Sequence, residues 1–366
     1  LNSPTSQVEA WIKTLLAQTA NDSNNLDAAS ATWNELLSLA SRADPIADSF
    51  TYDKLPEDLR RIHSPIGRPE HSAIKTLREH SDLVLTRISS IIGPAIHIPR
   101  DALCTNLLEC LEQNQVVIVT GPAGSGKSAI AKDVIGRLSQ EYIVFAFRAE
   151  EFAAPHLDDT IHRCQIVISS RALFSLLALH SKKLILIEST ERLLEKSERE
   201  SFAHLLQLIR DDNGWRIILT CRDYSLDIIR TSFLEYAGIP YSMVNIPLLD
   251  DTELNQAIAE IPKLRRPNEN PALHKLFLNP YILDKAVRMD WPENTKLPQD
   301  ERSFRSKVWK EIIREDDKTA SGMPMKREEV FLQIALRRAQ SLDQFAKCSD
   351  LDKQALDHLR NSNLIE

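Results

Sequence analysis

A single run of eight residues, 121–128, constrains this chain more than any other part of it. Its letters, GPAGSGKS, match in full the pattern G-x-x-x-x-G-K-[ST] of phosphate-binding loops. The chain has only nine glycines in 366 residues, and three of them fall in this run. Glycine reaches positive φ and allows close approach of a ligand, so such a loop can turn its N–H groups inward as an anion nest. The run therefore predicts a loop that binds phosphate groups.

The flanking residues predict a strand before the loop and a helix after it. Residues 116–120 form an apolar run, and apolar residues recur at helical spacing over 129–138. A strand, this loop and a helix in that order are typical of a nucleoside triphosphate site, with the helix N-terminus adding to the anion site. The residues predicted to bind the nucleotide here are Gly121, Pro122, Ala123, Gly124, Ser125, Gly126, Lys127, Ser128 and Ala129.

Two residues of the loop and one acid elsewhere form a predicted catalytic and metal site. Lys127 is placed to reach the β- and γ-phosphates, and the Ser128 hydroxyl to ligate Mg²⁺. Such a site also needs an acid at the end of a buried strand to hold the metal. The apolar run 184–187 is followed by Glu188, which fits this role although Asp is usual there. The extra methylene lengthens the reach, and the metal contact is then either shifted or made through water.

Two further residues are predicted to act in catalysis. Glu191 is the other acid near the strand end and is able to polarise an attacking water, although spacing does not decide between Glu188 and Glu191 as the base. The alternative to this catalytic role is that Glu191 only faces solvent, beside Arg192. Arg222 follows the core strand 217–220 and is able to aim a guanidinium at the γ-phosphate. Its alternative is a structural ion pair with Asp223 or a contact with a helix terminus.

The middle of the chain alternates strands and helices, which predicts a parallel sheet covered on both faces. The nucleotide should lie beyond the carboxyl ends of the strands. A capping box of Ser197 and Glu200 is expected to open one helix. The expected strands are 116–120, 143–147, 184–187, 217–220 and 243–246, and the helices between them lie at 172–179, 197–210 and 226–234. The helices expected after residue 247 lie at 250–260, 272–278, 281–289, 304–314, 327–339 and 351–360.

Four domains are predicted. Residues 1–92 form a helical N-terminal adaptor or oligomerisation region, with helices around 8–16, 33–40 and 72–92, the last capped by Ser72. Residues 93–247 form the nucleotide-binding domain, 248–298 a helical lid domain, and 299–366 a final helical domain. The chain begins with Leu1 and ends within an apolar element at 363–366, so we expect further domains outside it.

Composition limits the partners and the compartment. The net charge of −7 argues against coating by nucleic acid, so nucleic acid is possible but not indicated. No apolar run approaches the roughly 18 residues that a membrane span needs, and no signal peptide opens the chain. The five cysteines are scattered without a C-x-x-C pair, so we expect buried free thiols in a reducing cytoplasm.

Several segments resemble the STAND class of AAA+-related P-loop NTPases, which includes the NACHT and NB-ARC switches. They are the phosphate loop, the strand ending in Glu188, and the residues 220–223, TCRD. Residues 96–100 resemble the element whose arginine, here Arg100, abuts the adenine, and 279–283 the lid motif whose proline, here Pro280, touches the base. Residues 350–366 are similar to helices of a winged-helix domain, here truncated before its usual histidine. The strings 147–152 and 219–225 look like a bacterial branch associated with antiviral defence.

The resemblance implies an α/β P-loop NTPase core with a parallel five-stranded sheet, a helical N-terminal region, a helical lid and a winged-helix-like C-terminal region. It also implies an ATP/ADP-binding signalling switch in bacterial antiviral or stress defence, with slow Mg²⁺-dependent ATP hydrolysis and ATP-promoted self-oligomerisation. Sensor and effector domains would lie outside this chain. One alternative is an AAA+ motor or loader acting on nucleic acid or protein, favoured by ten Lys and Arg against seven Asp and Glu over 301–340. Others are a nucleotide-binding scaffold without turnover and, least supported, a small-molecule kinase.

Overall fold

The computed structural model describes residues 26–42, 69–94, 96–178, 180–315, 322–341, 346–361 and 364–365, and the single residues 9, 12, 13, 16 and 57. The chain divides into two compact units, Leu1–Ser72 and Ala73–Glu366. In the first unit, helix α2 (Leu26–Arg42) confirms the helix predicted around 33–40. Most of the helix predicted at 8–16 lies outside the described residues.

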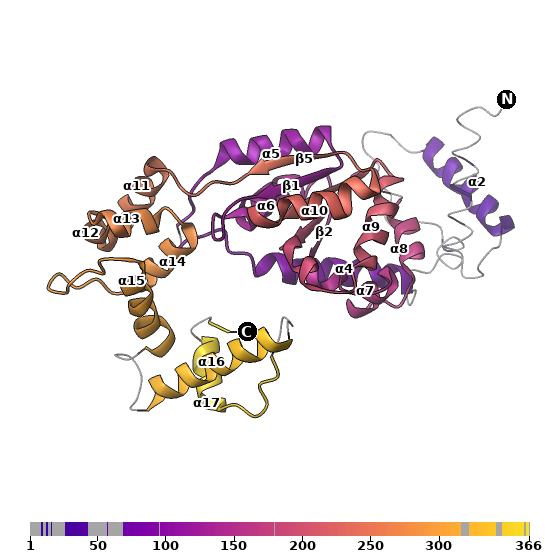
Figure 1. The fold of residues 1–366 in the computed structure, drawn as a ribbon. Helices are drawn as coiled ribbons and strands as arrows, with labels where there is room; N and C mark the ends of the chain where they lie inside the picture. The colour runs from indigo at the N-terminus through magenta and orange to yellow at the C-terminus, as the bar shows by residue number, and fades with distance from the viewer. Residues whose placement is uncertain are drawn as a thin grey trace. The chain divides into compact units, whose positions relative to one another are not determined.

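The second unit is built on one sheet of five parallel strands (Figure 1). The strands follow the order β2-β3-β4-β1-β5, so the carboxyl ends of β1, β4 and β3 are neighbours. Loops that follow these three strands therefore meet at one edge of the sheet. The strands are β1 (Val116–Thr120), β2 (Ile143–Arg148), β3 (Lys183–Glu188), β4 (Trp215–Thr220) and β5 (Tyr241–Asn245). This arrangement confirms the predicted α/β P-loop NTPase core.

Helices cover both faces of the sheet, which explains why the inner strands read as continuous apolar runs. On one face α5 (Asp101–Gln113) and α6 (Lys127–Leu138) pack against Val117, Val119 and Leu186. On the other face the packing residues include Ile118, Ile185 and Leu219. The elements there are α7 (Leu157–Arg163), α8 (Ser170–Leu177), α9 (Glu200–Arg210), α10 (Leu226–Ile229) and the π-helix η5 (Arg230–Glu235). All five cysteines are free thiols, of which Cys104, Cys164 and Cys221 are buried.

Helix α4 (Pro69–Thr86) covers the open edge of the sheet at β2. The Ser81 hydroxyl accepts a hydrogen bond from the Ala146 amide at 3.0 Å and donates to the Leu77 carbonyl at 2.6 Å. An edge strand with a covered N–H is protected from pairing with other chains. The prediction that Ser72 caps this helix is wrong, because the helix already begins at Pro69, a residue suited to the first helical position.

A second predicted cap is also wrong. Helix α9 begins at Glu200, its N-cap is Arg199, and the Glu200 carboxylate accepts the Arg199 amide at 2.9 Å. The acid therefore caps its own helix locally, and the predicted partner Ser197 lies outside the helix. Strand β5 begins two residues before the predicted start and ends at Asn245.

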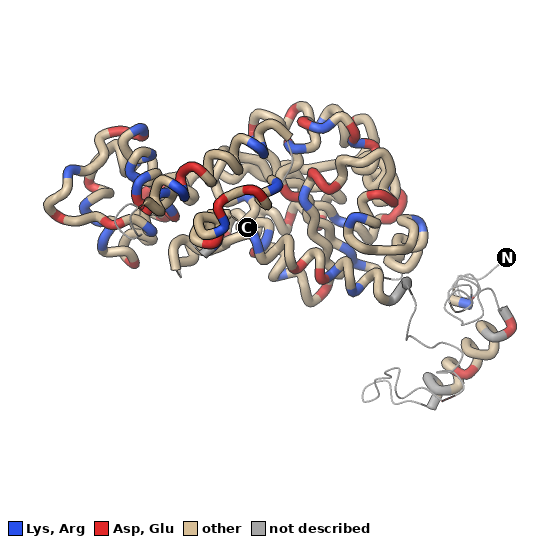
Figure 2. The backbone as a smooth tube through the Cα atoms, turned by 90° about the horizontal axis from the view of Figure 1, so that it is seen from below, with Lys and Arg blue, Asp and Glu red and all other residues tan. Residues whose placement is uncertain are grey.

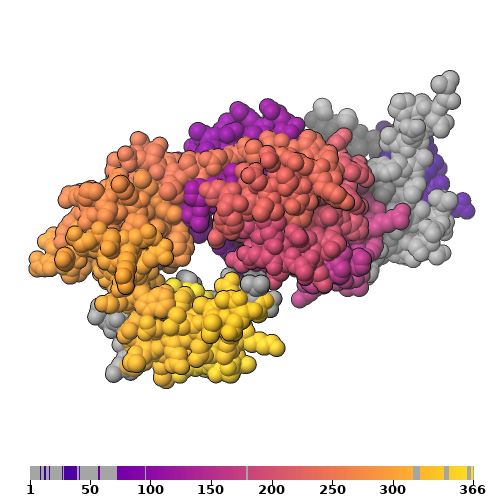
Figure 3. Space-filling view, in the orientation of Figure 1, coloured from indigo at the N-terminus to yellow at the C-terminus, as the bar shows by residue number. Residues whose placement is uncertain are grey.

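The helices after β5 form further apolar clusters. One joins Leu254, Phe277, Leu283 and Phe304 and gives this part of the chain a compact mass of its own, orange in Figure 3. The elements here are α11 (Asp251–Ala259), η6 (Pro262–Leu264), α12 (Arg265–Asn268), α13 (Pro271–Phe277), α14 (Pro280–Arg288), α15 (Glu301–Val308) and the π-helix η7 (Trp309–Arg314). Another cluster joins α16 (Met323–Ser341) and α17 (Lys353–Asn361). The boundaries of the four predicted domains and the winged-helix likeness stay predictions.

No helix among the described residues has the length and apolar character that crossing a membrane requires.

Candidate functional site

The phosphate loop connects β1 to α6, and its glycines adopt backbone conformations that favour glycine. Gly121, Gly124 and Gly126 have φ of 145°, 79° and 93°. A Cβ at Gly121 would collide with the Ile246 carbonyl. The N-cap of α6 is Gly126, which makes no side-chain cap. The first N–H groups of this 12-residue helix are therefore open to an anion.

The Lys127 side chain folds back over the start of the phosphate loop. Its Nζ donates to the carbonyls of Gly121 at 3.0 Å and Pro122 at 2.7 Å. Burial lowers the pKa of this ammonium, while Glu191 and Asp223 oppose the shift. A nucleotide phosphate would offer the ammonium a stronger, charged acceptor than these carbonyls.

The predicted metal ligands are in contact. The Ser128 hydroxyl, in the first turn of α6, donates to Glu188 Oε1 at 2.8 Å, and Glu188 is the last residue of β3. Glu188, which is one methylene longer than the usual Asp, thus contacts Ser128 directly. Burial raises the pKa of the Glu188 carboxyl, and the bond from Ser128 opposes this. A hydroxyl and a carboxylate are hard oxygen ligands, and Mg²⁺ is commonly held by one or two protein oxygens together with phosphate. The pair fits that ion.

Glu191 and Arg222 form an ion pair beside this site. Ser189, with φ of 58°, turns the chain sharply after β3, and its amide donates to Thr220 Oγ1 at 2.9 Å. The turn leads into the 3₁₀ helix η3 (Thr190–Glu195) and places Glu191 3.3 Å from Arg222 Nε. The second carboxylate oxygen of Glu191 is buried and makes no hydrogen bond within the described part of the chain. The Glu191 side chain therefore does not face solvent. Arg222 forms this ion pair with Glu191, whereas the alternative considered from the sequence was a pair with Asp223.

Arg100 uses all five of its N–H donors within the protein. Nε and Nη2 bind Glu253 at 2.8 and 3.4 Å, Nη1 binds the carbonyls of Ser125 and Pro247 at 3.1 Å each, and Nη2 also binds the Leu248 carbonyl at 3.2 Å. The side chain is 6% exposed. This geometry makes it a tether between the phosphate loop and α11. The adenine contact predicted for Arg100 stays a prediction.

Pro280 begins α14, and the residues beside it rest on the phosphate loop. Asn279 caps the helix, since its Oδ1 accepts the amides of Tyr281 at 3.0 Å and Ile282 at 3.4 Å. Its Nδ2 donates to the Ala123 carbonyl at 2.9 Å. The Tyr281 amide also donates to the Gly124 carbonyl at 3.4 Å. The start of α14 and the phosphate loop are thus in direct contact.

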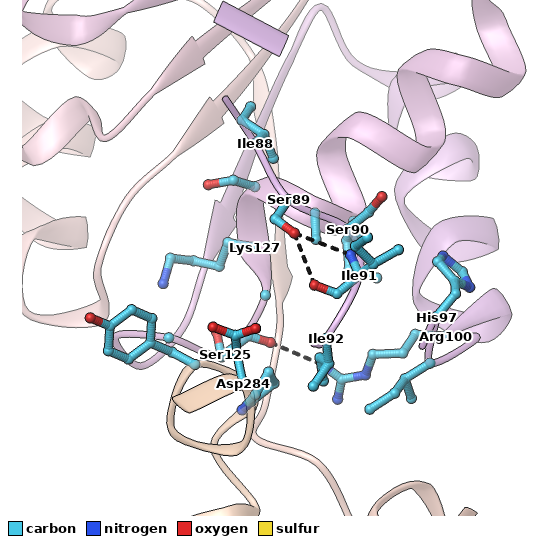
Figure 4. A pocket seen from close by; sticks show the side chains of 18 of the residues that line it. Ile88, Ser89, Ser90, Ile91, Ile92, His97, Arg100, Ser125, Lys127 and Asp284 are labelled. Atoms are coloured by element: carbon cyan, nitrogen blue, oxygen red, sulfur yellow. Dashed lines mark hydrogen bonds between the residues drawn. The ribbon is translucent and has the colours of Figure 1, made fainter. Parts of the chain in front are cut away.

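A cavity of about 730 Å³ opens beside the loop, within the range typical of small-molecule sites. Figure 4 shows Lys127, Ser125 and Asp284 toward one side of the view, and Ser90, Ile91 and His97 toward the other. Of the predicted site residues it is lined by Arg100, Gly124, Ser125, Gly126, Lys127, Ser128, Ala129, Glu188 and Pro280. Gly121, Pro122, Ala123, Glu191 and Arg222 do not line it.

Sequence reasoning missed the wall opposite the loop. The segment after α4 turns at Gly93, with φ of 61°, and bridges Ile92 to Ile96. Asp284 of α14 accepts the Gly93 amide at 3.0 Å and so joins this wall to α14. In the sequence, the Gly93-Pro94 pair indicates a turn at this position, but it does not predict that a cavity lies beside the turn.

A comparison with models of known protein families finds one match. A family model described as Novel STAND NTPase 3 matches residues 100–259. No curated protein sequence matches the chain.

Solved structures resemble the chain weakly. A Walker-type ATPase of Pyrococcus abyssi is 16% identical, with a TM-score of 0.44, over 76% of this chain and 93% of that one. The ORC2 protein of Aeropyrum pernix is 16% identical, with a TM-score of 0.40, over 76% and 89%. A STAND protein with a tetratricopeptide repeat sensor from Pyrococcus horikoshii is 13% identical, with a TM-score of 0.40, over 66% of this chain and only 36% of that one. Together, the family match over residues 100–259, the phosphate loop and the sheet order identify a P-loop NTPase of the STAND class.

Proposed function

We propose that this chain is an ATP/ADP-gated signalling switch, in which ADP with the lid closed is the resting state and ATP favours an open, self-associating state. The observation that carries this proposal is the seat of α14 on the phosphate loop, through Asn279 and the Ala123 carbonyl at 2.9 Å. A lid that touches the loop cannot move without changing the nucleotide site. Nucleotides that bind the two lid positions with different affinity would therefore shift the population between them.

The chain's own residues supply the phosphate chemistry in this proposal. Lys127 would exchange its carbonyl partners for the β- and γ-phosphates, and the open N-terminus of α6 would receive the same anion. Ser128 and Glu188 would hold Mg²⁺, which neutralises phosphate charge when bound. Because partial burial raises the pKa of Glu188, a cation beside it would also favour its ionised form.

We propose slow hydrolysis, because the two remaining catalytic candidates hold each other. Glu191 is the candidate base, and one of its oxygens faces Arg222 at 3.3 Å. Arg222 is the candidate for stabilising charge on the γ-phosphate, and it does not line the cavity. Turnover would require Arg222 to leave Glu191 and turn toward the phosphate. A step that breaks an ion pair before chemistry is suited to a timer rather than to a rapid enzyme.

The cellular role rests on the resemblance of the sequence. We propose a cytoplasmic protein of bacterial antiviral or stress defence, with sensor and effector domains outside these residues and ATP-promoted oligomers as the active form. Residues 1–92 would serve as adaptor or oligomerisation region.

A motor that grips nucleic acid or protein is the second candidate function, and the ion pairs of its basic segment count against it. Six of the basic residues between 301 and 340 each face an acid: Arg305 with Glu301, Lys307 with Glu311, Arg314 with Glu328, Lys326 with Asp352, Arg327 with Glu315, and Arg337 with Asp350. Figure 2 likewise shows basic and acidic positions interspersed along the described backbone. Such a surface has little net charge to attract phosphates.

The first experiment is to identify the nucleotide in freshly purified protein, by denaturing it and separating the supernatant by ion exchange. Stoichiometric ADP would support the switch. An empty site that hydrolyses added ATP at about one per second or faster would favour a motor. Stable ATP in the site without turnover would favour a scaffold. A protein that neither carries nor binds nucleotide would refute the proposal.

A further inference from the structure

Three successive peptide carbonyls of the phosphate loop accept hydrogen bonds from outside the loop. The Ala123 carbonyl accepts from Asn279 Nδ2 at 2.9 Å, and the Gly124 carbonyl accepts from the Tyr281 amide at 3.4 Å. The Ser125 carbonyl accepts from Arg100 Nη1 at 3.1 Å, drawn as a dashed line in Figure 4. All three donors lie outside residues 121–128 of the sequence, and Arg100 and Tyr281 also line the cavity beside the loop.

The orientation of a carbonyl fixes the orientation of the next amide. In a trans peptide the C=O and N–H groups point in opposite directions. Because the three carbonyls point toward Asn279, Tyr281 and Arg100, the amides of Gly124, Ser125 and Gly126 point away from these three residues. Consistent with this, the Ser125 amide makes its bond within the loop, to the Pro122 carbonyl at 3.3 Å. Inward amides are the groups that bind an anion in such a nest.

Two of the three donors belong to the lid, and the third is tied to it. Asn279 and Tyr281 stand at the start of α14. Arg100 is bonded to Glu253, which lies in the first turn of α11 and completes the capping box of that helix with Asp250. Gly124 leaves room for this contact, because a Cβ there would lie 2.5 Å from Asn279 Oδ1 and 2.9 Å from the Tyr281 Cβ.

We propose that the lid shapes the phosphate site from behind, with Asn279 as the principal positioning residue and Arg100 as the second. The lid then raises affinity for the phosphates of a nucleoside diphosphate without touching them, because it preorganises the amides that do. This inference rests on the proposed function, since it assumes that the loop binds nucleotide.

The chain supplies a matched control. Asn270 and Pro271 open α13 as Asn279 and Pro280 open α14, and Asn270 Oδ1 caps its helix by accepting the amides of Ala272 at 2.9 Å and Leu273 at 3.4 Å. Its Nδ2, however, donates to the Pro298 carbonyl at 3.4 Å and not to the loop. Asn279→Ser and Asn270→Ser each keep a capping hydroxyl and lose an amide donor. Only the first removes a contact to the phosphate loop.

The experiment measures release of a fluorescent ADP analogue and thermal unfolding for the whole chain and both variants. We expect Asn279→Ser to release ADP about five- to tenfold faster than the wild type, the effect of one lost hydrogen bond of about 1 kcal/mol. Asn270→Ser should release it at the wild-type rate. Without nucleotide, the two variants should unfold at similar temperatures, which separates a positioning effect from lost helix capping.

Each result decides one question. Wild-type binding with equal release rates in both variants would overturn the inference and leave the proposed function standing. Equal acceleration in both variants would also overturn it, since the effect would then come from lid stability alone. A wild type that binds no ADP would refute the proposed function and the inference together.

Discussion

Arg222 Nε lies 3.3 Å from Glu191 Oε1, so the candidate sensor of the γ-phosphate and the candidate base hold each other in this structure. The pair is asymmetric, because the Arg222 side chain is 46% exposed and that of Glu191 only 8%. Removing the arginine leaves a buried carboxylate without its cation, whereas removing the acid leaves a largely solvated guanidinium. Removing Arg222 should therefore cost more stability than removing Glu191, because it leaves the buried charge unpaired.

Substitutions of this pair should separate nucleotide preference from hydrolysis. We expect Arg222→Ala to keep ADP affinity and to weaken ATP binding about tenfold or more, the effect of one charge-assisted hydrogen bond. Glu191→Gln should keep both affinities and slow hydrolysis by about 10²- to 10⁴-fold, as for loss of a general base. Calorimetric titration and single-turnover hydrolysis test these effects. Full hydrolysis in Glu191→Gln would assign the base to another residue, with Glu188 the next candidate.

Lys127→Ala should remove nucleotide binding. In the proposed function the ammonium binds the nucleotide phosphates, so its loss should weaken ADP binding at least about a hundredfold. Arg137→Ala is a suitable control, because Arg137 lies on the same helix, is exposed, and pairs with Asp101 at 2.5 Å. Equilibrium dialysis with labelled ADP measures both. Normal binding by Lys127→Ala would show that the loop is not a phosphate site.

The burial of Glu188 predicts a specific dependence of stability on pH. Burial raises the pKa of its carboxyl above the ordinary 4.5, so the folded state holds this proton more tightly than the unfolded chain. The contribution to stability is therefore complete below pH 4.5 and is lost as pH rises through the folded-state pKa. Glu188→Gln should abolish this loss, so the free energy of unfolding of the variant relative to wild type should increase with pH.

Urea unfolding without nucleotide or Mg²⁺, at several values above pH 4.5, measures the difference. Glu141→Gln is a control, because the hydrogen bond from Lys182 lowers the pKa of the exposed Glu141 carboxyl. Its contribution to stability is complete above the ordinary pKa of 4.5, so the difference between this variant and wild type should stay constant over the same pH range. A Glu188→Gln difference that stays constant with pH would mean that this carboxyl is not held in its protonated form by burial.

Gly124→Ala should block the seat of the lid. The new Cβ would lie 2.5 Å from Asn279 Oδ1, and φ of 79° is unfavourable for alanine. We expect faster ADP release and a loss of about 1 to 3 kcal/mol in stability from the strained backbone. Gly136→Ala, in the same helix that follows the loop, has no atom within 4 Å of the new Cβ and should gain about 0.5 to 1 kcal/mol. Unchanged ADP release in Gly124→Ala would mean that the lid does not control the site.

The sequence predicts those parts of the site that lie within one local stretch. The loop, its strand and its helix are contiguous, and Glu188 follows a recognisable buried strand, so pattern and spacing indicate them. Contacts between distant segments have no such signal. The bond of Asn279 to Ala123 joins residues 156 positions apart, and that of Asp284 to Gly93 joins residues 191 positions apart. The two predictions of helix caps were wrong for a local reason. The helices begin at Pro69 and Glu200, each within three residues of the predicted caps Ser72 and Ser197.

Arg100 offers a test of whether it acts as a tether or as a nucleotide contact. All five donors are engaged, two of them with Glu253, so Arg100→Lys and Glu253→Gln should damage the same structure. A double-mutant cycle should then show a coupling free energy of about 0.5 to 3 kcal/mol in unfolding without nucleotide. Each single variant should also weaken the binding of ATP and GTP analogues by the same factor, because the tether acts on the phosphate loop and not on the base. If Arg100→Lys instead changes the preference between the two bases while Glu253→Gln does not, the arginine contacts the base, as the resemblance implies.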